Sequence, residues 1–308
     1  MDTFLQQLIN GLTLGSVYAI VALGYTMVYG IIQLINFAHG ELVMIGAMVA
    51  FSVISLLSAN TALPPLAIVL LGTIAAIPVC VLVGYALERF AYRRLRHAPR
   101  LAPLITAIGA SIILQHIAMM IWSRNPLAFP QFIENRVVEV AGATITSVQI
   151  AIILTSILMM AGLSLIVYRT RLGIAMRATA QNPQIAGLMG IDINRMIAAT
   201  FMLGAALAAV AGVMVGTYYG VAHYTMGSML GLKAFSAAVL GGIGNLAGAM
   251  LGGMLLGIVE ALGTGYIGDL TNNVFGSNYQ DVFAFLVLIG VLVFRPSGLL
   301  GERIGERA

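Results

Sequence analysis

Long apolar runs recur along the chain, and they constrain its fold more than any other feature. A helix needs about 20 apolar residues to cross the hydrocarbon core of a bilayer, with roughly 17–25 as the usual range. Runs of that length are predicted at residues 8–32, 66–87, 101–122, 148–168 and 196–219. Only 8% of the 308 residues are charged, whereas a soluble domain carries about 25%. The sequence therefore predicts an all-α polytopic membrane protein.

Other apolar segments are shorter or interrupted. Those at residues 42–57 and 282–294 could cross only where the bilayer is thinned or where neighbouring helices support them. Residues 231–262 are expected to form a hairpin that is broken near residues 241–245 (GGIGN). Irregular backbone at membrane depth is tolerated only inside protein or beside a water-filled cavity. We therefore expect about eight transmembrane helices, with broken or re-entrant elements, in a single domain over residues 1–308.

The basic residues predict how the chain is oriented. Twelve of the fifteen lie in three polar stretches, residues 88–100, 169–195 and 295–308. Short loops rich in Lys and Arg stay in the cytoplasm, so these stretches are predicted inside and residues 123–147 and 263–281 outside. Topology thus explains the net charge of +4, and nucleic acid is not an expected partner.

The side of the N-terminus is predicted from the few charges near it. No Lys or Arg precedes Arg89, which favours an N-terminus outside. The chain begins Met1-Asp2-Thr3, without the basic start of a cleavable signal peptide, so the first apolar run is expected to remain as a span. The alternative is an N-terminus inside, with a re-entrant element at residues 30–41.

Residues 169–195 form a long polar segment between two apolar runs, and their sequence predicts helices. Asn182 suits an N-cap, Pro183 suits the first helical position, and Gly190 can end a helix in the left-handed conformation. Three apolar residues share one helical face: Ile185, Leu188 and Met189. An amphipathic helix outside the membrane, with no core of its own, needs a partner to cover it. We therefore predict that residues 171–190 form two short helices that bind another protein.

A polar interruption, residues 35–41 (INFAHGE), separates the first two apolar runs. One interpretation is a short interfacial loop that caps a helix. The other is a broken helix beside a translocation path, where side chains and freed backbone groups meet a polar solute. The two predicted breaks supply six candidate residues of a substrate path: Asn36, His39, Glu41, Gly242, Gly244 and Asn245.

Three further polar residues fall within or at the end of apolar runs. Lipid exposure of an acid is expensive, so we expect Glu260 at the wetted outer surface rather than in a cavity. Gln115 and His116 interrupt a span, and hydrogen bonds between helices are their expected role.

Catalytic, metal and nucleotide sites are not expected in this chain. The phosphate-binding pattern G-x-x-x-x-G-K-[ST] is absent, and the single lysine, Lys233, lies in Gly-Leu-Lys-Ala, so any ATP must be hydrolysed by another chain. Four scattered histidines and one cysteine, Cys80, predict neither a metal ligand set nor a bound cofactor. An ion-coupled transporter or channel is an alternative class, but it should show more intramembrane acids. An intramembrane enzyme would need a nucleophile or metal constellation that the sequence lacks.

Several stretches carry more specific information than composition does. They are residues 11–19, 24–30, 35–41, 177–182 with 190–191, 233–244 and 295–299. Together they resemble the LivH-type permease subunit of branched-chain amino acid ABC importers, and the resemblance runs nearly end to end. Each glycine-rich stretch is weak evidence alone, whereas the combination is specific.

The resemblance implies a permease subunit of an ATP-driven importer in the bacterial inner membrane. It implies three kinds of partner besides the lipid bilayer: a second related permease, two ATPase subunits and a periplasmic binding protein that delivers leucine, isoleucine or valine. Residues 169–195 would be the cytoplasmic coupling segment, with seven candidate contact residues: Arg177, Asn182, Pro183, Ile185, Leu188, Met189 and Gly190. Related permeases carry urea, short amides or other amino acids, which are the alternative substrates.

Overall fold

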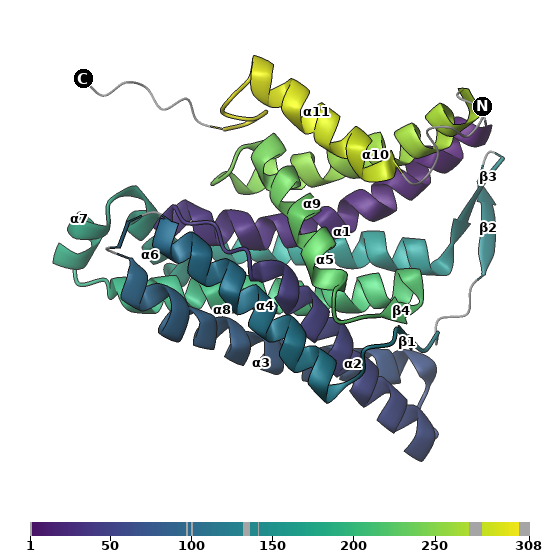
Figure 1. Ribbon diagram of the computed structural model, residues 1–308, viewed down its shortest axis with the longest axis horizontal. Helices are drawn as coiled ribbons and strands as arrows, with labels where there is room; N and C mark the ends of the chain where they lie inside the picture. The colour runs from purple at the N-terminus through teal and green to yellow at the C-terminus, as the bar shows by residue number, and fades with distance from the viewer. Residues whose placement is uncertain are drawn as a thin grey trace. The chain divides into compact units, whose positions relative to one another are not determined.

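The computed structural model describes residues 2–96, 98–99, 101–131, 136–140, 142–270 and 279–301. Within this part of the chain, seven helices are long and apolar enough to cross a membrane (Figure 1). They are α1 (Asp2–Ile32), α2 (His39–Asn60), α3 (Pro65–Ala86), α4 (Leu101–Ile121), α5 (Ser147–Arg169), α8 (Ile193–Tyr219) and α10 (Leu246–Leu270). Two apolar helices are shorter, α9 (Met226–Gly241) and α11 (Gln280–Phe294). The predicted all-α polytopic fold is confirmed.

The helix boundaries correct one prediction and confirm another. The second apolar segment was expected to be short, yet α2 has 22 residues and begins at His39. The polar residues of its first turn belong to the helix, because they are buried in protein instead of facing lipid. The break expected near residues 241–245 is present between α9 and α10. Residues 132–135, 271–278 and 302–308 of the predicted loops lie outside the described residues.

The chain divides into two compact units. Unit 1 comprises Met1–Thr26, Asn135–Met160 and Lys233–Ala308, and unit 2 comprises Met27–Glu134 and Ala161–Leu232. Helices α1, α5 and α9 therefore each contribute residues to both units. The single transmembrane domain expected over residues 1–308 stays a prediction.

In unit 2, the spans α2, α3, α4 and α8 lie side by side (Figure 1). Small residues allow this approach: a Cβ at Gly46 would lie 2.6 Å from Ala209 Cα, and one at Gly212 would lie 2.1 Å from Val43 O. Apolar surface gains little from helix association in lipid, so dense backbone contact supplies van der Waals attraction instead. At one end of α8, β4 (Val221–Ala222) pairs antiparallel with β1 (Leu127–Ala128).

In unit 1, α10 packs against both α1 and α9 through glycines. A Cβ at Gly257 would lie 2.2 Å from Gly15 N, and one at Gly252 would lie 2.1 Å from Ala237 O. The strands β2 (Val137–Val140) and β3 (Ala143–Thr146) form an antiparallel hairpin.

The N-terminal end of α1 is bonded to this hairpin. The Thr144 N–H donates to Gln6 Oε1 at 2.8 Å, and Gln6 Nε2 donates to Thr144 O at 3.0 Å. Residues 123–147 are predicted outside from the arginine distribution. The pairing therefore favours an N-terminus on the same, outer side, and the sidedness of all loops stays a prediction.

Candidate functional site

The two short helices predicted in residues 171–190 are present. Helix α6 spans Arg171–Gln181 and α7 spans Pro183–Leu188. Asn182 caps α7, because its Oδ1 accepts the Ile185 N–H at 3.0 Å, and Pro183 occupies the first turn, where its missing N–H costs nothing. Gly190 has a φ of +85°, the left-handed conformation that the sequence predicted. Helices α6 and α7 both lie at the end of α8 that is far from β4 (Figure 1).

The predicted apolar face of α7 is uncovered within the described chain. The exposed fractions of its residues are 58% for Ile185, 86% for Leu188 and 79% for Met189. Arg177 of α6 points to its own chain, with its guanidinium carbon 5.3 Å from the centre of the Tyr168 ring, a cation–π distance. An apolar face of this kind outside the spans is a surface suited to a protein partner.

The interruption between α1 and α2 is only partly a surface loop. Gln33 is exposed, whereas Asn36, His39 and Glu41 are each at most 1% exposed. Asn36 Oδ1 accepts two hydrogen bonds, from Tyr92 Oη at 2.9 Å and from the Ala38 N–H at 3.1 Å. The structure thus brings the three predicted path residues of this break together within unit 2, buried in protein.

Glu41 lies at the meeting point of three helices. Its Oε1 accepts hydrogen bonds from Ser111 at 2.9 Å and Gln115 at 2.8 Å in α4, and from Ser228 at 3.2 Å in α9. Its Oε2 is buried without a hydrogen-bond partner among the described residues. A buried carboxylate oxygen is costly to leave unpaired. This carboxyl therefore has capacity to bind a polar or cationic group if the helices separate.

The predicted hydrogen-bonding roles in α4 divide between the two residues. Gln115 bonds across helices, to Glu41 and to Ser228, as expected. His116 bonds through Nδ1 to the Ile112 carbonyl of its own helix at 2.8 Å, and its predicted bond to another helix stays a prediction.

The break between α9 and α10 is closed by the C-terminal stretch. Gly242 and Gly244 have φ values of +104° and +97°, where a side chain would be strained. The Leu300 N–H donates to Gly241 O at 2.9 Å, and Asn245 Nδ2 donates to Leu300 O at 2.9 Å. The structure thus places the path candidates Gly242, Gly244 and Asn245 in unit 1, in a turn whose backbone groups protein satisfies. Because residues 295–308 are predicted inside, the turn is also predicted on the cytoplasmic side.

Unit 1 also contains a buried ionic cluster that the sequence analysis missed. Lys233 Nζ lies 2.7 Å from Glu260 Oε1 and 2.6 Å from Asp281 Oδ1. Tyr18 Oη donates to Glu260 Oε1 at 3.1 Å, and Gln280 also bonds to it. Glu260 is 0% exposed, so its expected place at a wetted surface was wrong. The available signal was Lys233, a single lysine within an apolar run. We name these five residues the Lys233 cluster.

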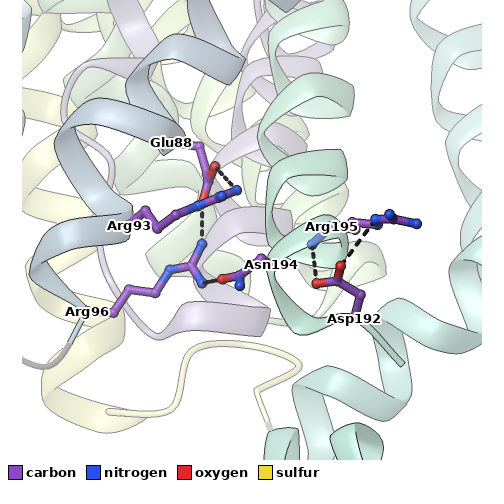
Figure 2. A network of polar contacts seen from close by, with 6 residues as sticks. All are labelled: Glu88, Arg93, Arg96, Asp192, Asn194 and Arg195. Atoms are coloured by element: carbon purple, nitrogen blue, oxygen red, sulfur yellow. Dashed lines mark hydrogen bonds and ion pairs between the residues drawn. The ribbon is translucent and has the colours of Figure 1, made fainter. Parts of the chain in front are cut away.

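A second ionic group, formed by Glu88, Arg93 and Arg96 and named the Glu88 cluster, joins the segment that follows α3 to the start of α8 (Figure 2). Glu88 is 0% exposed and lies in the π-helical turn η1 (Leu87–Tyr92). Arg93 Nη2 lies 2.9 Å from its Oε2, Arg96 also pairs with it, and Arg96 Nη1 donates to Asn194 Oδ1 at 2.7 Å. Burial lowers the pKa of the Arg96 guanidinium, and the Glu88 charge offsets part of this shift. Their distribution along the sequence had indicated a topological role alone.

No group of three or more His, Cys, Asp or Glu side chains in the described part of the chain could hold a metal ion. Fold and site together define a polytopic helical membrane protein with buried polar groups between its helices and an uncovered amphipathic helix outside the spans. This is the class of membrane transport subunits.

Comparison with known proteins identifies the family. Residues 7–292 match the family model described as branched-chain amino acid transport system / permease component. The chain is 50% identical, over 304 residues, to the high-affinity branched-chain amino acid transport system permease protein BraD of Pseudomonas aeruginosa. The aligned region covers 97% of this chain and 96% of that protein. The chain belongs to this permease family, and the resemblance seen in the sequence is confirmed.

Other relatives also match the chain along most of its length. The permease protein LivH of Escherichia coli K12 is 45% identical over 303 residues, covering 97% of this chain and 96% of LivH. A probable branched-chain amino acid transport permease protein LivH of Methanocaldococcus jannaschii is 28% identical over 289 residues, 92% of this chain and 88% of that protein. No solved structure matches the chain.

Proposed function

We propose that this chain translocates leucine, isoleucine and valine across the bacterial inner membrane, as the permease subunit of an ATP-driven importer. The observation that carries the proposal is the 45–50% identity, along 97% of the chain, to permeases named for high-affinity branched-chain amino acid transport. Urea, short amides and other amino acids are the competing substrates, because related permeases carry them.

The importer needs partners for the tasks that this chain lacks residues to perform. ATP is hydrolysed by two ATPase subunits, since the sequence has no phosphate-binding loop of its own. A second, related permease completes the membrane part, and a periplasmic binding protein delivers the substrate. The uncovered face of α7 supports this assignment, because it offers an ATPase subunit an apolar contact outside the membrane.

The substrate path runs along the first break, past Asn36, His39 and Glu41. Support comes from the concentration of buried polar side chains there, and above all from Glu41 Oε2, which has no hydrogen-bond partner in the described part of the chain. The turn at Gly242, Gly244 and Asn245 is the second proposed border. Its closure by residues 299–300 favours a supporting role.

Cysteine labelling tests the path. A cysteine at Ala38, in a chain whose native Cys80 is replaced by Ala, is expected to react with small polar thiol reagents at a rate that depends on the nucleotide state of the complex. Ala38 is 0% exposed in this structure, so reaction requires the break to open. A cysteine at lipid-facing Leu82, 67% exposed, is the control and should stay inert to polar reagents. If the cysteines at Ala38 and Leu82 were equally inert in every nucleotide state, the substrate path would not run along this break.

The function is tested by uptake of labelled leucine into proteoliposomes. These contain this chain, the second permease and the ATPase subunits, and are supplied with the binding protein. Unlabelled isoleucine and valine are expected to compete, whereas urea and acetamide are not. Competition by urea or acetamide alone would reassign the substrate and leave the permease role intact.

A further inference from the structure

Helix α7 is tied closely to the start of α8. The Ile191 N–H donates to Ala186 O at 3.1 Å, and Asp192 caps α8 by accepting the Arg195 N–H at 3.2 Å. Four residues, 189–192, separate the two helices. We therefore expect a displacement of α7 to displace the first turn of α8 as well.

The first turn of α8 is bonded in turn to the segment that follows η1. Asn194 accepts a hydrogen bond from Arg96 at 2.7 Å, and Arg96 also pairs with Glu88 (Figure 2). Glu88 is 0% exposed, and a buried charge that loses its partners is strongly destabilising. The pairs of Glu88 with Arg93 and Arg96 thus resist separation, and a shift of Asn194 reaches η1 through its exposed hydrogen bond to Arg96.

η1 reaches the polar break through Tyr92. This side chain is 1% exposed and donates its hydroxyl proton to Asn36 Oδ1 at 2.9 Å. Its ring lies 5.1 Å from the ring of Phe201 in α8, within an apolar cluster that also contains Val28 and Ile197. Because Asn36 Oδ1 also accepts the Ala38 N–H, the Tyr92 bond acts on the backbone of the break itself.

We propose that Asn194, Arg96 and Tyr92 are positioning residues that transmit movement of the ATPase-binding helix α7 to the break at residues 33–38, where the substrate path opens. All these residues belong to unit 2, and every step is a hydrogen bond, an ion pair or a packed ring. The inference rests on the proposed function, since it names the residues that carry the coupling between ATP hydrolysis and transport.

Two conservative variants break the connection at different points without removing a charge. Asn194→Ala removes the acceptor for Arg96 and leaves Glu88 paired with both arginines, while Tyr92→Phe removes one hydroxyl and keeps the ring packing. The matched control is Arg195→Ala, which removes the exposed pair Asp192–Arg195 at the same end of α8, on the side away from Arg96 (Figure 2). All three leave the apolar face of α7 unchanged.

The readout is the number of leucine molecules taken up per ATP hydrolysed by the complete complex in proteoliposomes. Asn194→Ala and Tyr92→Phe are each expected to lower this ratio about fivefold or more, the size of a typical coupling between sites, with ATPase association unchanged. Arg195→Ala is expected to stay within about twofold of the unmodified chain. The double variant should lose little more than the worse single variant, because contacts in series are not additive.

A merely structural role would lower the amount of folded complex and leave the ratio unchanged. Each of three results would overturn the inference. The ratio could be unchanged in both variants, Arg195→Ala could lower it equally, or the losses could multiply in the double variant. If the unmodified complex takes up no leucine with ATP, the proposed function itself has failed, and that result differs from all of these.

Discussion

Replacing Leu188 by Asp is expected to abolish leucine uptake while the chain still inserts into the membrane. Leu188 is 86% exposed on α7, and burying a leucine side chain contributes about 1.5–3 kcal/mol. The variant loses that contribution and places a carboxylate in an apolar contact, where desolvation opposes binding. A loss of about 3 kcal/mol corresponds to roughly a 100-fold weaker ATPase affinity. Co-purification of the ATPase subunits and uptake by proteoliposomes measure the two effects.

The same helix supplies the control for this variant. Gly187 is exposed, a Cβ there would have nothing within 4 Å, and helical spacing places it opposite the apolar face. Gly187→Asp therefore adds the same charge outside the proposed contact, and it should retain ATPase association and uptake. Normal uptake and normal ATPase binding in Leu188→Asp would show that α7 is only a solvated segment. Equal losses in both variants would point to charge and not to the apolar face.

Replacing Lys233 by Met is expected to destabilise the folded chain by about 3–5 kcal/mol. The physical reason is that Glu260, 0% exposed, loses the ammonium group 2.7 Å from its Oε1 and becomes an uncompensated charge. Asp281 loses the same partner, but it is partly exposed and can be solvated. Thermal unfolding of the purified chain in detergent, with its apparent free-energy change, is the measurement.

A second substitution should rescue this variant. Lys233→Met with Glu260→Gln removes both charges of the closest pair, and the amide can still bond to Tyr18 and Gln280, so most of the lost stability should return. Arg195→Ala, which breaks an exposed ion pair, should change stability by about 0–1 kcal/mol. A Lys233→Met chain as stable as the unmodified one would show that the Lys233 cluster contributes little to the fold.

Local features of the fold were predictable from the sequence because they depend on neighbouring residues. The cap at Asn182, the first-turn Pro183 and the left-handed Gly190 follow from side-chain chemistry within a few positions. The apolar runs predicted most spans because a span also depends on residues that are adjacent in sequence. The beginning of α2 was the exception, because His39 and Glu41 in its first turn are polar and lie buried in protein, which a search for apolar runs does not detect.

The ionic clusters were not predictable, because their partners are distant in sequence. Glu260 pairs with Lys233, 27 positions away, and Glu41 bonds to Ser228, 187 positions away. Composition and spacing cannot say which of the few polar side chains in the membrane meet. The arginines of residues 88–100 show the same limit: their abundance predicted a cytoplasmic location, whereas the bond between Arg96 and Asn194 depends on the packing of α3 against α8.

The energy source for leucine uptake is the most direct test of the central claim, that this chain is the permease of an ATP-driven importer. The measurement uses proteoliposomes with the complete complex and the binding protein, loaded with or without ATP on the ATPase side, and with proton and sodium gradients collapsed. The account predicts accumulation of labelled leucine only with ATP, and none when the ATPase subunits are omitted. Accumulation that needs an ion gradient and proceeds without the ATPase subunits would contradict it and assign the chain to the ion-coupled transporters.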